Sequence, residues 1–541
     1  MTTSMPLTLV RLRLQRLRRD RWQLAAWVLG TALLAVASIS AVTQTYATED
    51  ARKEILGVAI ATRTILMFRG TPDGVAEGQF VFFLLFAWLA LMGGLMSTFL
   101  AVRHTRAEEE IGRAELVAAT PAGRILPTLA TVIHGVAANV ALGFLVAVGW
   151  SALGLGVAGS FVAGAALTVS GIAFLAIGLV AAQLVRTSRA ANTIGVAAVI
   201  GAYLLRGIGD AAGTPSADLT HLTPAWPTYL SPIGYGQLAH PFSEATLWPL
   251  AVPLGVAALL IALVFWLQSV RDQGASLVPA RNGRATAPRG LSSSFGLVWR
   301  LNRSILLSWA VGGVATGLLA TSLTSLVDQI AGGSPQVLDM LRRAVGSGAS
   351  VEQAFVAVFY GLIGILAACC AVQVGIRARQ EEASGTAEVV LAAPVARVRW
   401  LLEYWIVGVI VIVVVLAASL GAGLIGTQNA SIRQNVIEAA TAQLPACLVF
   451  LGLTVLAFAL VPRWTIAIGW SVVGVSAILG LFGPLFQFPD WLVKLSPFAH
   501  SPVPGAAGAD WSGGFVMIGI GVVAAAIAVA TMRRRELAPA G

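Results

Sequence analysis

The sequence predicts an all-α polytopic membrane protein with about 12 transmembrane helices in two pseudo-symmetric halves of six spans each. Apolar residues make up 57% of the 541 residues, and the mean hydropathy is +0.83. A soluble domain contains only roughly 45 to 50% apolar residues. Twelve apolar runs approach the roughly 20 residues that a helix needs to cross a bilayer. A charged segment between the second and third runs recurs six runs later, which predicts the repeat.

The apolar runs give the predicted spans of each half. The spans of the first half are 23–42, 80–102, 125–149, 161–185, 190–205 and 247–267. Those of the second half are 306–327, 354–376, 400–425, 444–461, 465–485 and 515–531. The loops 43–79 and 328–353, which follow the first and seventh spans, mix charged and apolar residues. We expect short helices in both loops.

Arginine placement predicts the orientation of the chain. If the N-terminus lies inside, 26 of the 35 Lys and Arg residues fall on the cytoplasmic side. This excess predicts that both termini are cytoplasmic in a multi-pass membrane protein. Lysine occurs only at Lys53 and Lys494, a usage that indicates a GC-rich genome, so we expect the bacterial cytoplasmic membrane. The net charge of +10 is explained by these clusters, so we expect the lipid bilayer as a partner and no nucleic acid.

Each half opens with a basic segment. In 7–21, Leu7, Val10, Leu14 and Leu17 share one helical face, which is typical of a helix in the membrane interface, although Leu12 breaks the pattern. A counterpart, 295–303, follows a stretch rich in Gly, Pro, Ala and Arg. We therefore predict a first half at 1–272 with an N-terminal interfacial helix, a cytoplasmic linker at 273–290, and a second half at 291–541.

The repeated charged segment occupies 106–124 and 379–397, which align without a gap and share ten of nineteen residues. Glu109 stands four residues before Arg113, the favourable order for a helical ion pair, and Pro121 limits that helix. One such segment is ordinarily a solvated connector. Two copies that retain glutamates, which contribute little to orientation, instead predict a docking surface for a soluble partner of complementary charge.

Two further landmarks support the repeat. Residues 27–30, Trp-Val-Leu-Gly, match Trp-Ala-Val-Gly at 309–312. The triplet Leu-Ser-Pro at 230–232 recurs at 495–497. Both pairs occur in the same order relative to the spans, which predicts halves of parallel order.

The chain shows no motif typical of a nucleotide-binding or metal-binding site. No Gly-x-x-x-x-Gly-Lys-Ser/Thr phosphate loop occurs, and the five histidines show no His-x-x-x-His spacing. We therefore predict no catalytic residue, no metal site and no cofactor in this chain. His134 and Glu403 are the titratable residues of the predicted spans. We interpret them as a packing histidine and an interfacial glutamate, with functional titration as the alternative.

Aromatic residues cluster in the second and eighth predicted spans. Phe83 and Phe86, with Phe355 and Phe359 six spans later, are candidates for a hydrophobic substrate path. Packing between helices or contact with lipid is the more frequent role of such rings.

The pattern Glu108-Glu-Glu-x-Gly-Arg-x-Glu115 followed by Thr120-Pro121, repeated six spans later, resembles the permease subunits of ATP-binding-cassette (ABC) exporters of the type-two membrane family. The layout is similar to fused twelve-span actinobacterial exporters of polyketide antibiotics and other drugs. The resemblance implies coupling helices that contact the ATPase through Glu108, Glu109, Glu110, Gly112, Arg113, Glu115, Pro121, Glu381, Glu382, Gly385, Glu388 and Pro394. The second copy departs from the pattern at Ala383 and Thr386, which implies unequal docking.

The resemblance implies an ATP-driven permease that is not itself an enzyme. Two copies of a separately encoded ABC ATPase would bind the ATP and Mg, and a hydrophobic or amphipathic small molecule, such as an antibiotic, would be exported. The alternatives are a proton-coupled secondary transporter, and a non-transporting membrane scaffold or intramembrane enzyme.

Overall fold

The computed structural model describes residues 5–120, 123, 125–279, 285–322, 351–483, 488–502 and 511–537. Twelve candidate spans are found in these residues, which confirms the predicted all-α polytopic membrane fold. The chain folds as two compact units, Met1–Gly283 and Arg284–Gly541, each with six of the candidate spans. The division between the units falls within the predicted linker 273–290.

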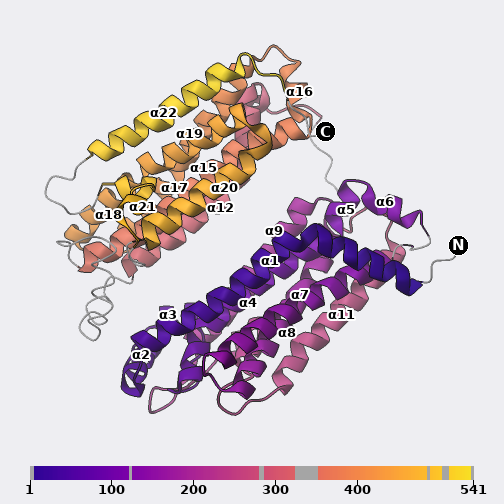
Figure 1. Cartoon of the computed structure of the whole chain (residues 1–541), viewed down its shortest axis with the longest axis vertical. Coiled ribbons are helices and arrows are strands. Elements are labelled where there is room, and N and C mark those ends of the chain that lie inside the picture. The colour runs from indigo at the N-terminus through magenta and orange to yellow at the C-terminus, as the bar shows by residue number, and fades with distance from the viewer. Residues whose placement is uncertain are drawn as a thin grey trace. The chain divides into compact units, whose positions relative to one another are not determined.

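Six long helices form the body of unit 1 (Figure 1). They are α1 (Met5–Thr45), α4 (Glu77–Arg103), α7 (Ile125–Ala152), α8 (Val157–Leu184), α9 (Ser188–Ala211) and α11 (Trp248–Val270). The shorter elements are α2 (Glu49–Ala61), α3 (Arg63–Arg69), α5 (Arg106–Glu110), α6 (Arg113–Ala118), the 3-10 turn η1 (Trp226–Leu230), α10 (Pro232–Gln237) and a small antiparallel sheet of β1 (Thr214–Pro215) and β2 (Leu222–Thr223). Helices α4 and α8 are the most buried and pack on each other.

Unit 2 repeats this order of helices. Its long elements are α12 (Ser294–Ser322), α15 (Val351–Ala383), α17 (Arg397–Ile425), α18 (Ala430–Ala442) followed by α19 (Leu444–Leu460), α20 (Thr465–Ala477) and α22 (Ser512–Met532). Its shorter elements are η2 (Arg289–Leu291), α16 (Thr386–Leu391), η3 (Pro462–Trp464), the π-helical turn η4 (Ile478–Phe482), α21 (Asp490–Val493) and η5 (Pro497–His500).

Corresponding helices make corresponding contacts inside the two units. Helix α1 packs on α4 and α7, as α12 packs on α15 and α17. Helix α8 packs on α4 and α11, as α19 packs on α15 and α22. The serine of the Leu-Ser-Pro landmark caps a short helix in both units, α10 and η5. The buried hydroxyls of Ser231 and Ser496 each accept a hydrogen bond from the backbone N–H two residues later, at 3.2 and 3.3 Å.

The predicted interfacial segment 7–21 is continuous with the first span, since α1 is one helix from Met5 to Thr45. Figure 1 shows that its N-terminal end turns away from the axis of the rest of the helix. Val10, Leu14 and Leu17 of the predicted apolar face are exposed, as expected of side chains that contact lipid.

The short helices expected in loop 43–79 are confirmed as α2 and α3. Loop 328–353 lies almost wholly outside the described residues. The fifth span extends past the predicted 205 to Ala211, because the two charges that ended the prediction satisfy each other. Arg206 and Asp210 are fully buried and form an ion pair of 2.9 Å. The guanidinium of Arg206 also donates to the carbonyl of Met67 at 2.9 Å.

Candidate functional site

Both copies of the charged segment form the same helix–glycine–helix bend. In unit 1, Gly112 separates α5 from α6 with a φ of +74°. In unit 2, Gly385 separates the end of α15 from α16 with a φ of +76°. This left-handed backbone conformation favours glycine because a side chain would be strained there. The bend therefore explains why glycine occupies this position in both copies.

In unit 1 a glutamate of the bend lies between two arginines. The carboxylate of Glu109 accepts from Arg106 at 2.7 Å and from Arg271 at 2.7 Å, and its side chain is only 10% exposed. Arg106 lies in α5 itself, whereas Arg271 directly follows the last span, α11. Arg106 also donates to the carbonyl of Ala182 in α8 at 2.8 Å. Glu109 thus fastens the charged segment to the ends of two spans.

Unit 2 contains the same arrangement at the equivalent residue. Glu382 is 1% exposed and is paired with Arg379, at 3.4 Å, and with Arg535. Arg535 follows the last span, α22, and donates to the carbonyl of Phe458 at 3.0 Å. We refer to Glu109 and Glu382, each with its two arginines, as the buried clamps. From the sequence, Arg271 and Arg535 are interpreted only as orienting charges. Their shared position after the last span of each unit, α11 and α22, is the signal that could have identified them.

The repeated segment contains a second pair of equivalent glutamates. Glu115 in α6 and Glu388 in α16 occupy equivalent positions and are both exposed. Each is followed by an exposed apolar residue, Leu116 at 73% and Val389 at 76%. We refer to Glu115–Leu116 and Glu388–Val389 as the exposed pairs. Glu109 and Glu382 therefore hold the segment in place, whereas Glu115 and Glu388 are exposed beside an apolar side chain.

The other predicted site residues surround these two groups. Glu108 is paired with Arg19 of α1, and Glu110 accepts from the backbone N–H of Ser188 at 2.9 Å. Glu381 is paired with Arg377 at 2.6 Å. Arg113 is exposed, and so is Pro394, which follows α16. Pro121 lies outside the described residues.

A cavity of about 420 Å³ lies between the charged segment of unit 1 and the helices behind it. Its lining includes Arg16 and Arg19 of α1, Leu116 and Val117 of α6, and Arg271. The segment therefore rests against the body of unit 1 through its buried clamp and its ion pair with α1, with open space beside them.

Phe83, Phe86 and Phe359 of the predicted substrate path pack inside the units. Phe83 and Phe86 are buried in unit 1, and the ring of Phe86 stacks on Phe82 at a centroid distance of 4.5 Å. Phe359 is partly buried in unit 2, and the side chain of Phe355 lies outside the described residues. These positions favour the packing interpretation of Phe83 and Phe86.

The two titratable residues of the predicted spans are both buried. Glu403 lies 3.0 Å from Arg399 and accepts a hydrogen bond of 2.6 Å from Ser294. His134 lies beside Asp20 and His104, a grouping that their distant positions in the sequence did not indicate.

The comparison with known proteins agrees with this architecture. Residues 291–533 match the family described as multidrug efflux system permease Rv1217c, C-terminal domain. Over 444 residues the chain is 36% identical to the multidrug efflux system permease protein Rv1217c of Mycobacterium tuberculosis (strain ATCC 25618 / H37Rv), which covers 81% of this chain and 78% of that protein. The chain therefore belongs to the family of Rv1217c-like multidrug efflux permeases, multi-pass proteins of bacterial membranes.

Proposed function

We propose that this chain is the membrane subunit of an ATP-driven exporter of the type-two ABC family, and that it moves hydrophobic or amphipathic compounds, such as antibiotics, out of the cell. Two copies of a separately encoded ATPase supply the energy and bind the ATP and Mg. Both termini and both charged segments lie on the cytoplasmic side, where the ATPase docks.

The exposed pairs are the observation that carries this proposal. An apolar side chain that is about three-quarters exposed gains roughly 1.5 to 3 kcal/mol when a partner buries it. The neighbouring carboxylate selects a partner surface of positive charge and steers its approach. One exposed pair occurs in each unit at the same place in the bend, which fits a partner that is present twice.

The buried clamps give this docking surface a mechanical connection to the membrane helices. A displacement of α5 and α6 by the ATPase acts through Glu109 on Arg271, at the end of α11, and through Glu108 on Arg19 in α1. Each clamp glutamate is held by two ion pairs, so the charged segment and the ends of the spans move together. A rigid-body movement of the ATPase is therefore transmitted to the spans. This movement drives the change from an inward-open to an outward-open permease.

Co-expression with a candidate ATPase tests the proposal. We expect the double variant Glu115→Arg/Glu388→Arg to lose co-purification of the ATPase and drug-stimulated ATP hydrolysis, while its melting temperature and membrane insertion stay at wild-type values. Glu54→Arg in α2, also an exposed glutamate, is the matched control and keeps full activity. Normal ATPase binding by the double variant would contradict the proposal.

A proton-coupled carrier is the second candidate, favoured by the buried cluster of Asp20, His104 and His134. Buried titratable groups are typical of proton pathways in membranes. Reconstituted chain without any ATPase would then move substrate along an imposed pH gradient, and Asp20→Asn would stop that movement. The ATP-driven proposal predicts no transport in this assay.

A further inference from the structure

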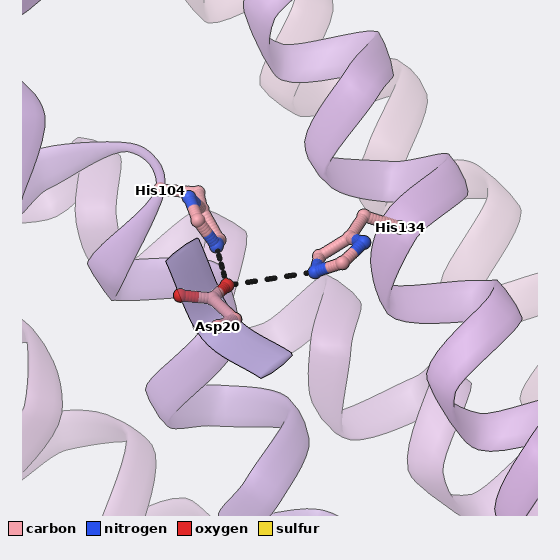
Figure 2. A group of neighbouring side chains, drawn as sticks. All are labelled: Asp20, His104 and His134. Atoms are coloured by element: carbon pink, nitrogen blue, oxygen red, sulfur yellow. Dashed lines mark hydrogen bonds and ion pairs between the residues drawn. The ribbon is translucent and has the colours of Figure 1, made fainter. Parts of the chain in front are cut away.

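Three helices of unit 1 bring Asp20, His104 and His134 together (Figure 2). Asp20 lies in α1, His104 caps the C-terminus of α4, and His134 lies in α7. All three side chains are buried. One carboxylate oxygen of Asp20 contacts Nε2 of His104 and lies 3.5 Å from Nε2 of His134.

One nitrogen of this cluster is incompletely satisfied. Nε2 of His134 is buried, lies 3.5 Å from the Asp20 carboxylate and makes no hydrogen bond with the described residues. Burying a polar atom without a partner costs roughly 1 to 3 kcal/mol. In Figure 2 the Nε2 atoms of both imidazoles point toward the Asp20 carboxylate. A cation placed between these atoms would remove the cost that His134 otherwise carries.

We propose that Asp20, His104 and His134 bind a divalent transition-metal ion, with Zn²⁺ as the best match. Two imidazole nitrogens and one carboxylate oxygen are the donor set of zinc sites that keep a fourth position open. The three ligand atoms lie within 4.8 Å of one another, so small side-chain rotations bring them to the roughly 2.0–2.2 Å that zinc requires.

Arg103 supports the carboxylate ligand from its other side. Its Nε lies 2.9 Å from Oδ1 of Asp20, which leaves Oδ2 to face the histidines. Ligating carboxylates are commonly fixed by such outer partners. A second guanidinium, that of Arg16, donates to Thr131 at 2.7 Å and also lies near the cluster. These two positive charges oppose a dication, so the ion binds less tightly than in a structural zinc site.

Two hollows border the cluster. His104 lines the cavity of about 420 Å³ behind the charged segment. His134 lines a second hollow of about 570 Å³ between α1 and α7. Each histidine therefore borders an open space, and the ligand atoms themselves are buried.

The site belongs to unit 1 alone. The landmark that pairs Trp27 with Trp309 places Asn302 opposite Asp20, and the alignment of the charged segments places Arg377 and Val407 opposite His104 and His134. None of these three residues is a ligand that zinc prefers. A bound ion would hold α1 against α4 and α7 directly beside α5, and would restrain only one of the two charged segments.

Metal binding to the purified, chelator-treated full-length chain tests the proposal. We expect one Zn²⁺ per chain by calorimetry and elemental analysis, and a Co²⁺ complex with the visible absorption of a site of low coordination number. Asp20→Asn and His134→Val, which introduce the residue types of unit 2, should each weaken Zn²⁺ binding at least about 100-fold, since loss of even an outer partner costs 10–100-fold. His500→Gln, an exposed histidine outside the cluster, is the control and keeps wild-type affinity.

Thermal unfolding separates loss of the site from loss of the fold. Zn²⁺ should raise the melting temperature of the wild type and of His500→Gln, because an ion that binds the folded state stabilises it, and should leave the two cluster variants unchanged. His104→Gln keeps a hydrogen-bond donor toward Asp20 and gives a third, conservative test of the same loss. Absence of Zn²⁺ binding by the wild type, or equal binding by folded cluster variants, would overturn the proposal.

Discussion

Arg271 and Glu109 are 162 residues apart in the sequence and form an ion pair of 2.7 Å. Arg535 and Glu382 form the equivalent pair in unit 2. In each unit, therefore, the clamp glutamate of the repeated segment is bound to the arginine that follows the last span. The ion pair fixes the segment to the helix bundle. The buried clamps therefore hold the segment in place, a role different from the one proposed for the exposed pairs.

The buried clamps predict a large loss of stability when their carboxylate is removed. Glu109→Gln and Glu382→Gln each leave two arginines without their partner, and breaking a buried ion pair costs about 3–5 kcal/mol. We expect a clear decrease in melting temperature for both variants in detergent. Glu115→Gln, the exposed glutamate of the same segment, should stay within about 0.5 kcal/mol of the wild type. Equal stability of all three variants would show that the clamps do not hold the segment.

Variants of the exposed pairs should weaken ATPase binding without lowering the stability of the chain. Leu116→Ser and Val389→Ser remove apolar surface that is exposed in the isolated chain, so the melting temperature should not change. Loss of about 1.4 kcal/mol of docking energy weakens ATPase binding about tenfold per site. Titration of ATP hydrolysis with increasing ATPase measures this shift. Leu247→Ser, at an exposed leucine before α11, is the control and should leave the titration unchanged.

Replacing the glycine of either bend by alanine should strain the backbone without causing a steric clash. A Cβ at Gly112 or Gly385 meets no atom within 4 Å, so Gly→Ala is penalised only by the positive φ, by about 1–2 kcal/mol. Gly201→Ala in α9 and Gly474→Ala in α20 also have free space but lie inside helices, where alanine stabilises by about 0.5–1 kcal/mol. Thermal unfolding of the four variants should therefore shift in opposite directions. A shift of all four melting temperatures in the same direction would contradict the left-handed backbone conformation of the bend.

A histidine outside the spans predicts a pH-dependent contact. His240 bonds to Asp73 at 2.9 Å, and this hydrogen bond raises the pKa of the imidazole above its ordinary value, about 6.5, against the opposing effect of burial. Because the folded pKa is raised, the stabilisation is fully present below the ordinary value and is lost as the pH rises through the raised one. The difference in melting temperature between the wild type and His240→Gln should decrease over that window. A difference that grows with pH would contradict this assignment.

The spans and the repeat could be predicted from the sequence, because spans depend on local composition and the repeat appears as short matching segments in the same order in both halves. The length of an apolar run predicts a span regardless of its neighbours, so the sequence predicts the span of α9. Its end at Ala211 could not be predicted, because it depends on the buried ion pair of Arg206 and Asp210. The buried clamps and the metal cluster depend on residues that are far apart. Nothing in the spacing of Asp20, His104 and His134 indicates contact, because three different helices bring them together. The division between Glu109 and Glu115 also required the fold, since both are helical glutamates of the same segment.

Photocrosslinking from the exposed pairs tests the central claim most directly. A photoreactive amino acid placed at Leu116 or at Val389 in the native host should give, at both positions, an adduct that mass spectrometry identifies as a protein with a phosphate loop. The same probe at Trp226, an exposed residue of η1, should give no such adduct. Crosslinks to that ATPase at Trp226 but at neither Leu116 nor Val389 would contradict the docking of a separate ATPase on the repeated segment.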